Sequence, residues 1–331
     1  MQTRKLGSSG LEVSVVGLGC NNFGRRIDFD AARRVVARAL DLGVVLFDTA
    51  DVYGRGASEE MLGKLLGGRR KDVVLATKFG NPMDDAGRSI GGASRLGGAS
   101  RRYLCAAVEA SLTRLGTDWI DLYQIHGPDA LTPIEETLRA LDDLVRQGKV
   151  RYIGCSKFAA WQVVEAMWTA KHLGLTGFVS CQDEYNLLAR AIEPELIPAM
   201  QACGLGQLPY YPLASGLLTG KYRRGAPMPA GARLTGEARL SDYYLTDSNW
   251  AVVERLEAFC AERGHTLLEL AVSWLAQRPQ VASVIAGATR PEQVEQNVAA
   301  AGWQLAAADM AEIDRLTGFT PDPRRPGSYG R

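Results

Sequence analysis

Residues 120–156, IDLYQIHGPDALTPIEETLRALDDLVRQGKVRYIGCS, contain one complete copy of the pattern that decides the fold. The apolar runs 120–126 and 150–156 each end in polar residues, and each predicts a strand. Between them, residues 133–147 repeat apolar side chains at the 3.6-residue period of a helix, with acidic residues early and a basic residue late. The stretch therefore predicts a strand–helix–strand unit of a parallel α/β sheet.

The same unit recurs through the whole sequence of 331 residues, which predicts eight strands that alternate with helices. Eight units in a chain of this length favour an α/β fold of the closed (β/α)8 TIM-barrel type over an open doubly wound sheet. Residues 3–6 and 12–15 predict a β-hairpin before the barrel, and residues 306–317 predict a helix after it. The strands are expected at residues 15–20, 44–48, 73–78, 120–126, 150–156, 178–184, 205–210 and 281–286, and the intervening helices at 30–42, 58–66, 101–115, 133–147, 159–172, 194–203, 249–263, 266–276 and 291–301.

Two segments interrupt the repeat within what we expect to be one domain, residues 1–331. Residues 81–100 are rich in Gly, Ser and Arg and follow the third strand, and residues 222–247 are rich in Gly, Pro and Arg and follow the seventh. Both leave the carboxyl ends of strands, where barrels place their active sites. We therefore expect two pocket-covering loops, not interdomain linkers.

Composition excludes several classes of function. The 38 Lys and Arg residues nearly balance the 37 Asp and Glu residues, so the chain has no overall field that would hold nucleic acid or an anionic membrane. The sequence shows no signal-peptide pattern and no apolar run long enough to cross a membrane. The six scattered cysteines form no CxxC pair and the three histidines form no HExxH motif, which argues against a metal site. We expect a cytoplasmic protein that acts on a small molecule; its oligomeric state stays open.

Polar side chains end three consecutive predicted strands. Asp48 ends the second strand and Tyr53 follows it, Lys78 ends the third, and His126 ends the fourth. Because parallel strands of a barrel end at one rim, we expect these side chains to meet there. A nearby cation lowers the pKa of a tyrosine, a carboxylate can hold the lysine, and an imidazole can hydrogen-bond a substrate oxygen. The set could protonate an oxygen as negative charge develops on it.

Other chemistry stays open at this point. Lys78, if desolvated and neutral, could form a Schiff base as in an aldolase, although the adjacent carboxylate and Tyr53 argue against a neutral amine. The dinucleotide fingerprint GxGxxG is absent, and residues 216–221, GLLTGK, are one residue short of a P-loop. That segment still offers backbone amides and a lysine, which suit a phosphate.

Three runs carry a resemblance to a known family: FDTADVYG at 47–54, TKFG at 77–80 and DLYQIH at 121–126. In this order, over nearly the whole chain, they closely resemble the aldo-keto reductases. The resemblance implies an NADPH-dependent oxidoreductase that reduces an aldehyde, ketone or sugar to an alcohol by hydride transfer. It also implies a catalytic tetrad with Tyr53 as general acid. The tetrad would consist of Asp48, Tyr53, Lys78 and His126.

The resemblance extends to the cofactor. Residues 210–222, YYPLASGLLTGKY, are similar to the pyrophosphate-binding segment of the family, and residues 287–297, GATRPEQVEQN, to its adenosine 2′-phosphate and adenine site. A guanidinium and a helix N-terminus both suit a dianion, so we expect NADPH (NADP+) and regard NADH as less suited. The implied contacts are Ser156 and Gln182 at the carboxamide, Tyr210 at the nicotinamide ring, Leu213, Ser215 and Lys221 at the phosphates, Thr289 and Arg290 at the 2′-phosphate, Gln293, Gln296 and Asn297 at the adenine, and Asn21, Lys157 and Gly287 as further cofactor-binding residues.

Lys157 departs from the family pattern, which often has asparagine at this position. An ammonium only donates hydrogen bonds, whereas asparagine also accepts them. It also adds positive charge near a nicotinamide ring that is cationic when oxidised, which predicts weaker binding of NADP+ relative to NADPH. A basic residue here resembles the channel-associated branch of the family, so a non-catalytic, cofactor-sensing subunit is the alternative function. The complete tetrad favours an enzyme.

Overall fold

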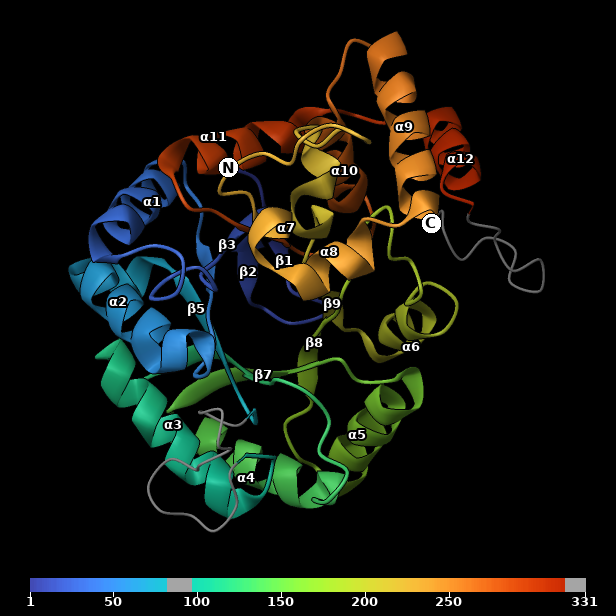
Figure 1. The fold of residues 1–331 in the computed structure, drawn as a ribbon. Helices are drawn as coiled ribbons and strands as arrows, with labels where there is room; N and C mark the ends of the chain where they lie inside the picture. The colour runs from blue at the N-terminus through green and yellow to red at the C-terminus, as the bar shows by residue number, and fades with distance from the viewer. Residues whose placement is uncertain (82–96, 319–331) are drawn as a thin grey trace.

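A computed structural model describes residues 1–81 and 97–318 of the chain. Its central sheet has eight parallel strands, each hydrogen-bonded to the next, and a parallel bridge between Gln207 and Val281 joins the two ends of the sheet. The expected (β/α)8 barrel is confirmed (Figure 1). In sheet order, the strands are β10 (Val284–Gly287), β3 (Val16–Gly19), β4 (Leu46–Asp48), β5 (Val74–Phe79), β6 (Ile120–Ile125), β7 (Val150–Ser156), β8 (Phe178–Gln182) and β9 (Gly206–Gln207).

Helices surround the strands on the outside, as Figure 1 shows. Helix α3 illustrates how the sequence sets their ends: Ser100 caps it by accepting a hydrogen bond from the Tyr103 amide, and Gly116 stops it in the left-handed conformation, at φ 60°. The principal helices are α1 (Phe29–Asp41), α2 (Ala57–Leu66), α3 (Arg101–Leu115), α4 (Ile134–Arg146), α5 (Ala160–Leu173), α6 (Leu196–Cys203), α9 (Asp247–Glu262), α10 (Leu267–Ala276) and α11 (Pro291–Ala299).

The ends of the chain also follow the expectation. Strands β1 (Thr3–Lys5) and β2 (Glu12–Ser14) form the antiparallel hairpin, and α12 (Ala307–Leu316) is the additional helix near the end of the described chain. The hairpin lies at the amino-terminal end of the barrel, where Leu6 joins an interior cluster with Leu46, Ala76 and Leu122. It therefore leaves the opposite rim free for a site.

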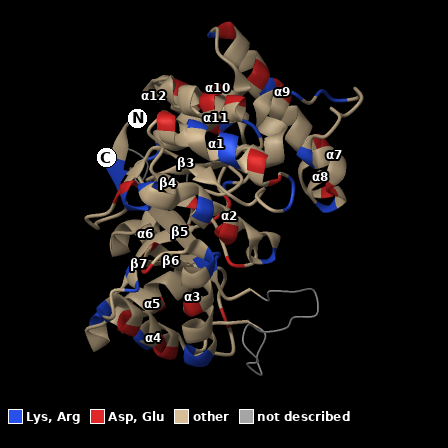
Figure 2. Cartoon of the chain, turned by 90° about the vertical axis from the view of Figure 1, so that its left-hand side faces the viewer, with Lys and Arg blue, Asp and Glu red and all other residues tan. Residues whose placement is uncertain are grey.

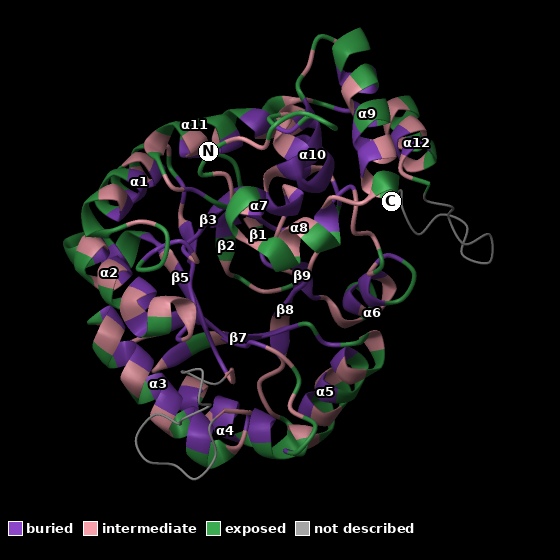
Figure 3. Cartoon of the chain, viewed as in Figure 1, coloured by how far each residue is buried: buried purple, intermediate pink, exposed green. Residues whose placement is uncertain are grey.

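Apolar residues fill two layers. A small cluster occupies the barrel interior, and larger clusters lie between the strands and the helices, so the buried residues in Figure 3 follow the strands and the inner helix faces. Lys and Arg alternate with Asp and Glu over the helices seen in Figure 2, in line with the near-zero net charge. Within the described residues, no helix is long and apolar enough to span a membrane.

The segment expected as a loop at 222–247 contains two short helices, α7 (Arg233–Gly236) and α8 (Ala238–Tyr244), and its last residue, Asp247, begins α9. The sequence did not predict these two helices, because short helices in a Gly- and Pro-rich segment give no periodic signal. Both helices lie across the mouth of the barrel in Figure 1. The other expected loop, 81–100, falls mostly on residues 82–96, which lie outside the described part of the chain.

Candidate active site

A cavity of about 2030 Å³ opens at the carboxyl ends of the strands, beneath α7 and α8. It lies where the (β/α)8 architecture places active sites. Lys78 lies fully buried beneath the cavity surface. All the other residues predicted for the site line the cavity: Asp48, Tyr53 and His126 from the tetrad, and Asn21, Ser156, Lys157, Gln182, Tyr210, Leu213, Ser215, Lys221, Gly287, Thr289, Arg290, Gln293, Gln296 and Asn297 from the cofactor set.

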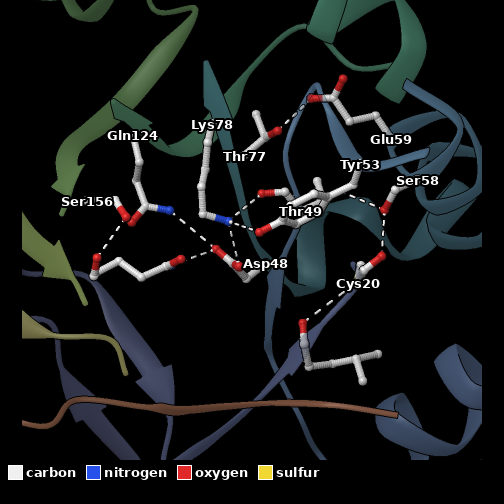
Figure 4. A network of polar contacts seen from close by, with 12 residues as sticks. Cys20, Asp48, Thr49, Tyr53, Ser58, Glu59, Thr77, Lys78, Gln124 and Ser156 are labelled. Atoms are coloured by element: carbon white, nitrogen blue, oxygen red, sulfur yellow. Dashed lines mark hydrogen bonds and ion pairs between the residues drawn. The ribbon is translucent and has the colours of Figure 1, made fainter. Parts of the chain in front are cut away.

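Lys78 joins the carboxylate to the phenol. Its Nζ donates to Asp48 Oδ2 at 2.7 Å and to the Thr49 carbonyl at 2.7 Å, and it lies 3.5 Å from Tyr53 Oη (Figure 4). Strands β4 and β5 are adjacent and in parallel register, which brings the ends of both strands to the same rim. The ammonium is therefore fixed by two short hydrogen bonds, with the phenolic oxygen within its reach.

Burial changes the ionisation of this group. Although burial alone lowers the pKa of Lys78, the Asp48 carboxylate and Tyr53 raise it, and the net pKa lies above its usual value. Lys78 is thus a cation at neutral pH. For Tyr53, burial raises the pKa more than Lys78 lowers it, so the expected net lowering was wrong. Tyr53 is a protonated phenol at neutral pH, and the nearby cation reduces the cost of losing that proton.

His126 is the fourth residue of the tetrad and lies at the same rim of the barrel. Its ring lies edge-on to the ring of Tyr53, with 5.8 Å between the centroids, and the side chain is buried. Burial lowers its pKa well below the usual value, and the charges of Lys78 and Lys157 lower it further. At neutral pH the imidazole is uncharged, so it can donate one hydrogen bond to a substrate oxygen without adding a positive charge.

Ser156 and Gln182 already have partners in the protein. Ser156 Oγ donates to the Gln182 carbonyl at 2.7 Å, and Gln182 Nε2 donates to Asp48 Oδ1 at 3.0 Å. Gln182 therefore links the predicted carboxamide site directly to the tetrad. Next to them, Lys157 has a left-handed backbone, at φ 61°, and lies near Asp183, whose pKa burial raises to about 6.

The far part of the cavity suits a phosphate-bearing cofactor. Three cations, Arg26, Lys221 and Arg290, lie close enough that, after burial, the two arginines lower the pKa of the Lys221 ammonium. Mutual repulsion of this kind favours a bound anion. Ser215 adds a buried hydroxyl that has no hydrogen-bond partner among the described residues, in a turn with left-handed backbone at φ 55°. These residues fit the pyrophosphate and 2′-phosphate of the expected cofactor.

Two residues of the predicted cofactor set, Thr289 and Gln293, are hydrogen-bonded to each other. Gln293 was expected to face the adenine and Thr289 the 2′-phosphate. In the structure, Gln293 Oε1 accepts from both the amide and the hydroxyl of Thr289, at 2.7 and 3.1 Å. This side chain closes the turn before α11, so both groups would have to exchange partners to contact a nucleotide.

Sequence reasoning missed three features of this region. Gln124 Nε2 donates to Asp48 Oδ1 at 3.3 Å, and Arg26 donates to the Gly231 carbonyl at 3.0 Å, which ties the two sides of the cavity mouth together. Glu184, two residues after β8, accepts from the Tyr244 hydroxyl on α8. Only Gln124 gave a usable signal, since it precedes His126 by two residues and shares its side of the strand.

Comparison with known proteins agrees with this geometry. The model of the aldo/keto reductase family matches residues 15–317, which cover every strand of the barrel and every residue of the site. The chain belongs to the aldo/keto reductase family. Members of this family generally use NAD(P)H.

Three aldo/keto reductase relatives show the range of names in the family. A probable voltage-gated potassium channel subunit beta of Arabidopsis thaliana is 38% identical over 99% of this chain and 100% of its own length. An uncharacterized oxidoreductase, YrpG, of Bacillus subtilis is 37% identical over 98% and 97% of the two chains. An L-glyceraldehyde 3-phosphate reductase of Escherichia coli O157:H7 is 34% identical over 95% and 92%.

Proposed function

We propose that the protein is an NADPH-dependent reductase that converts a carbonyl compound to an alcohol, with Tyr53 as the general acid. The supporting observation is the Tyr53 hydroxyl 3.5 Å from the buried Lys78 ammonium, with the His126 ring edge-on to the ring of Tyr53. Burial keeps the pKa of Tyr53 above its usual value and that of His126 below it. When bound, NADPH supplies the hydride for such a reduction. Tyr53 gives its proton to the substrate oxygen, Lys78 stabilises the resulting phenolate, and His126 orients the oxygen by a hydrogen bond.

The preference for NADPH rests on charge. Arg26, Lys221 and Arg290 gather at the cavity, and Arg290 directly precedes the N-terminus of α11. A helix N-terminus and a guanidinium together favour a phosphate dianion over a ribose hydroxyl. An Arg290→Gln variant should therefore weaken NADPH binding and leave NADH binding unchanged.

The substrate is a small carbonyl compound, and a phosphorylated triose belongs in the test panel because of the named Escherichia coli relative. The experiment is NADPH oxidation with aldehydes, ketones, sugars and L-glyceraldehyde 3-phosphate, with Tyr53→Phe as the control. Turnover that depends on Tyr53 supports the proposal. Turnover that survives in Tyr53→Phe refutes the role of this residue.

We also propose a cytoplasmic location, with neither nucleic acid nor membrane as a partner.

A second candidate is a cofactor-sensing channel subunit without catalysis. The 38% identity to the Arabidopsis channel subunit and the basic Lys157 favour it. Tight NADPH binding with no turnover of any carbonyl in the panel would favour this function over the reductase.

The Schiff-base aldolase is the weakest candidate. It needs a neutral amine, whereas Asp48 and Tyr53 keep the pKa of Lys78 above its usual value. Borohydride trapping of a substrate adduct on Lys78 would overturn this conclusion.

A further inference from the structure

Asp48 accepts hydrogen bonds from two side-chain amides, and the proposed mechanism accounts for only one of them. Gln182 Nε2 and Gln124 Nε2 both donate to Oδ1, at 3.0 and 3.3 Å, while Oδ2 accepts from Lys78 at 2.7 Å. Figure 4 shows the amide of Gln124 pointing from β6 across the barrel interior toward Asp48. The carboxylate therefore has one amide donor in addition to the residue expected to contact the cofactor.

Only one half of the Gln124 amide has a hydrogen-bond partner among the described residues. Gln124 is fully buried, and its Oε1 has no hydrogen-bond partner among the described residues. A buried amide oxygen without a partner destabilises a fold, so packing alone does not explain a glutamine at this position. Gly154, on the neighbouring strand β7, leaves space for the Gln124 side chain. A Cβ added at Gly154 would lie 3.2 Å from Gln124 Cγ and 2.4 Å from Ser180 Oγ.

We propose that Gln124 is a positioning residue that holds Asp48, and through it Lys78, while Gln182 turns to the nicotinamide carboxamide. This inference rests on the proposed function, since it assigns Gln182 to the cofactor. Without Gln124, binding of the cofactor would leave Asp48 Oδ1 with no side-chain amide donor from the described part of the chain. With Gln124 in place, Asp48 keeps an amide donor, and Lys78 keeps its position, whether or not Gln182 contacts the cofactor.

The first experiment compares Gln124→Met with a matched control, Gln207→Met. Gln207 is also fully buried, and neither atom of its side-chain amide has a partner in the described residues. Loss of one hydrogen bond to a charged group weakens an interaction about tenfold or more. We expect Gln124→Met to raise the Kd for NADPH and lower kcat by about that factor, and Gln207→Met to change neither.

A Gln182→Met background separates this role from a general structural one. With Gln182 absent, cofactor binding no longer competes for Asp48, so adding Gln124→Met should leave the Kd for NADPH where Gln182→Met alone sets it. The same loss from Gln124→Met in both backgrounds, or no loss in the wild-type background, would overturn the proposal.

The second experiment needs no cofactor. In Gln124→Glu, a carboxyl group lies against Asp48 and can donate only while it is protonated, because two adjacent carboxylates repel each other. The melting temperature of this variant should fall relative to wild type as the pH rises. In an Asp48→Asn background the fall should disappear, because the new carboxylate can then pair with Lys78.

The two experiments fail separately. A wild-type protein that neither binds NADPH nor reduces carbonyls would refute the proposed function, while the melting experiment would still decide whether Gln124 holds Asp48. A fall of equal size in Gln124→Glu with and without Asp48 would refute the positioning role itself.

Discussion

The buried ion pair between Lys78 and Asp48 gives the most quantitative prediction of the structure. Lys78 Nζ and Asp48 Oδ2 lie 2.7 Å apart, with 0% and 4% of the side chains exposed. At an effective dielectric constant of about 20, their mutual attraction is about 6 kcal/mol. Desolvation of both charges offsets much of this attraction in the folded protein. Removing one partner leaves the other buried and unpaired, so Lys78→Met or Asp48→Asn alone should each lower the free energy of unfolding by about 3–5 kcal/mol.

The double variant, Asp48→Asn with Lys78→Met, tests the same reasoning by removing both charges at once. It removes both charges of the pair and leaves neither one unpaired, so we expect it to be more stable than either single variant, as found when buried pairs are replaced together. The assay is urea denaturation followed by tryptophan fluorescence, with linear extrapolation to water. If the two single effects simply add in the double variant, Lys78 and Asp48 do not interact and this account of the pair is wrong.

Three further outcomes follow from the site. Because burial raises the pKa of Tyr53 and lowers that of His126, neither group changes charge between about pH 7 and 9. We therefore expect kcat for reduction to be flat over that range. A titration near pH 8 in wild type that is absent in Tyr53→Phe would contradict this. Asp51 is fully buried with its pKa raised well above the usual value by burial and by Glu59, so it binds its proton more tightly in the folded state than in the unfolded state. The contribution of Asp51 to the free energy of unfolding is fully present below about pH 4. It is lost as the pH rises toward the pKa of Asp51 in the folded state, by at most about 1.4 kcal/mol per pH unit. The melting temperature of Asp51→Asn should therefore rise relative to wild type between about pH 4 and pH 7, and an equal difference at both pH values would refute this prediction. Finally, Lys157→Asn should strengthen NADP+ binding relative to NADPH, measured as the ratio of the two dissociation constants, and an unchanged ratio would show that the Lys157 charge does not act on the ring.

The barrel and the placement of the tetrad could be predicted because they depend on local patterns. Apolar runs that end in polar residues locate the strands, and parallel strands of a closed sheet bring their carboxyl ends to one rim. Asp48, Lys78 and His126 therefore meet without any knowledge of the side-chain packing. The positions of Ser156 and Gln182 on β7 and β8 follow in the same way, since their strands are adjacent in the sheet.

What could not be predicted depends on packing across the barrel. The contact of Gln124 with Asp48 joins β6 to β4 through the interior, and only the side-chain conformations of both residues show it. The pKa of Tyr53 was predicted in the wrong direction because the sequence shows the neighbouring cation but not the extent of burial. Helices α7 and α8 are too short to show a period, and the contact of Thr289 with Gln293 depends on a side-chain rotamer.

The central claim is that Tyr53 donates the proton in an NADPH-dependent reduction. The most direct measurement compares wild type and Tyr53→Phe in two assays on the same samples: NADPH affinity by fluorescence titration, and kcat for the best carbonyl substrate of the panel. A general acid contributes about 10²–10⁴-fold to the rate, so kcat should fall by that factor while the Kd for NADPH stays within about twofold of wild type. A Tyr53→Phe protein that binds NADPH and keeps its kcat would contradict the account.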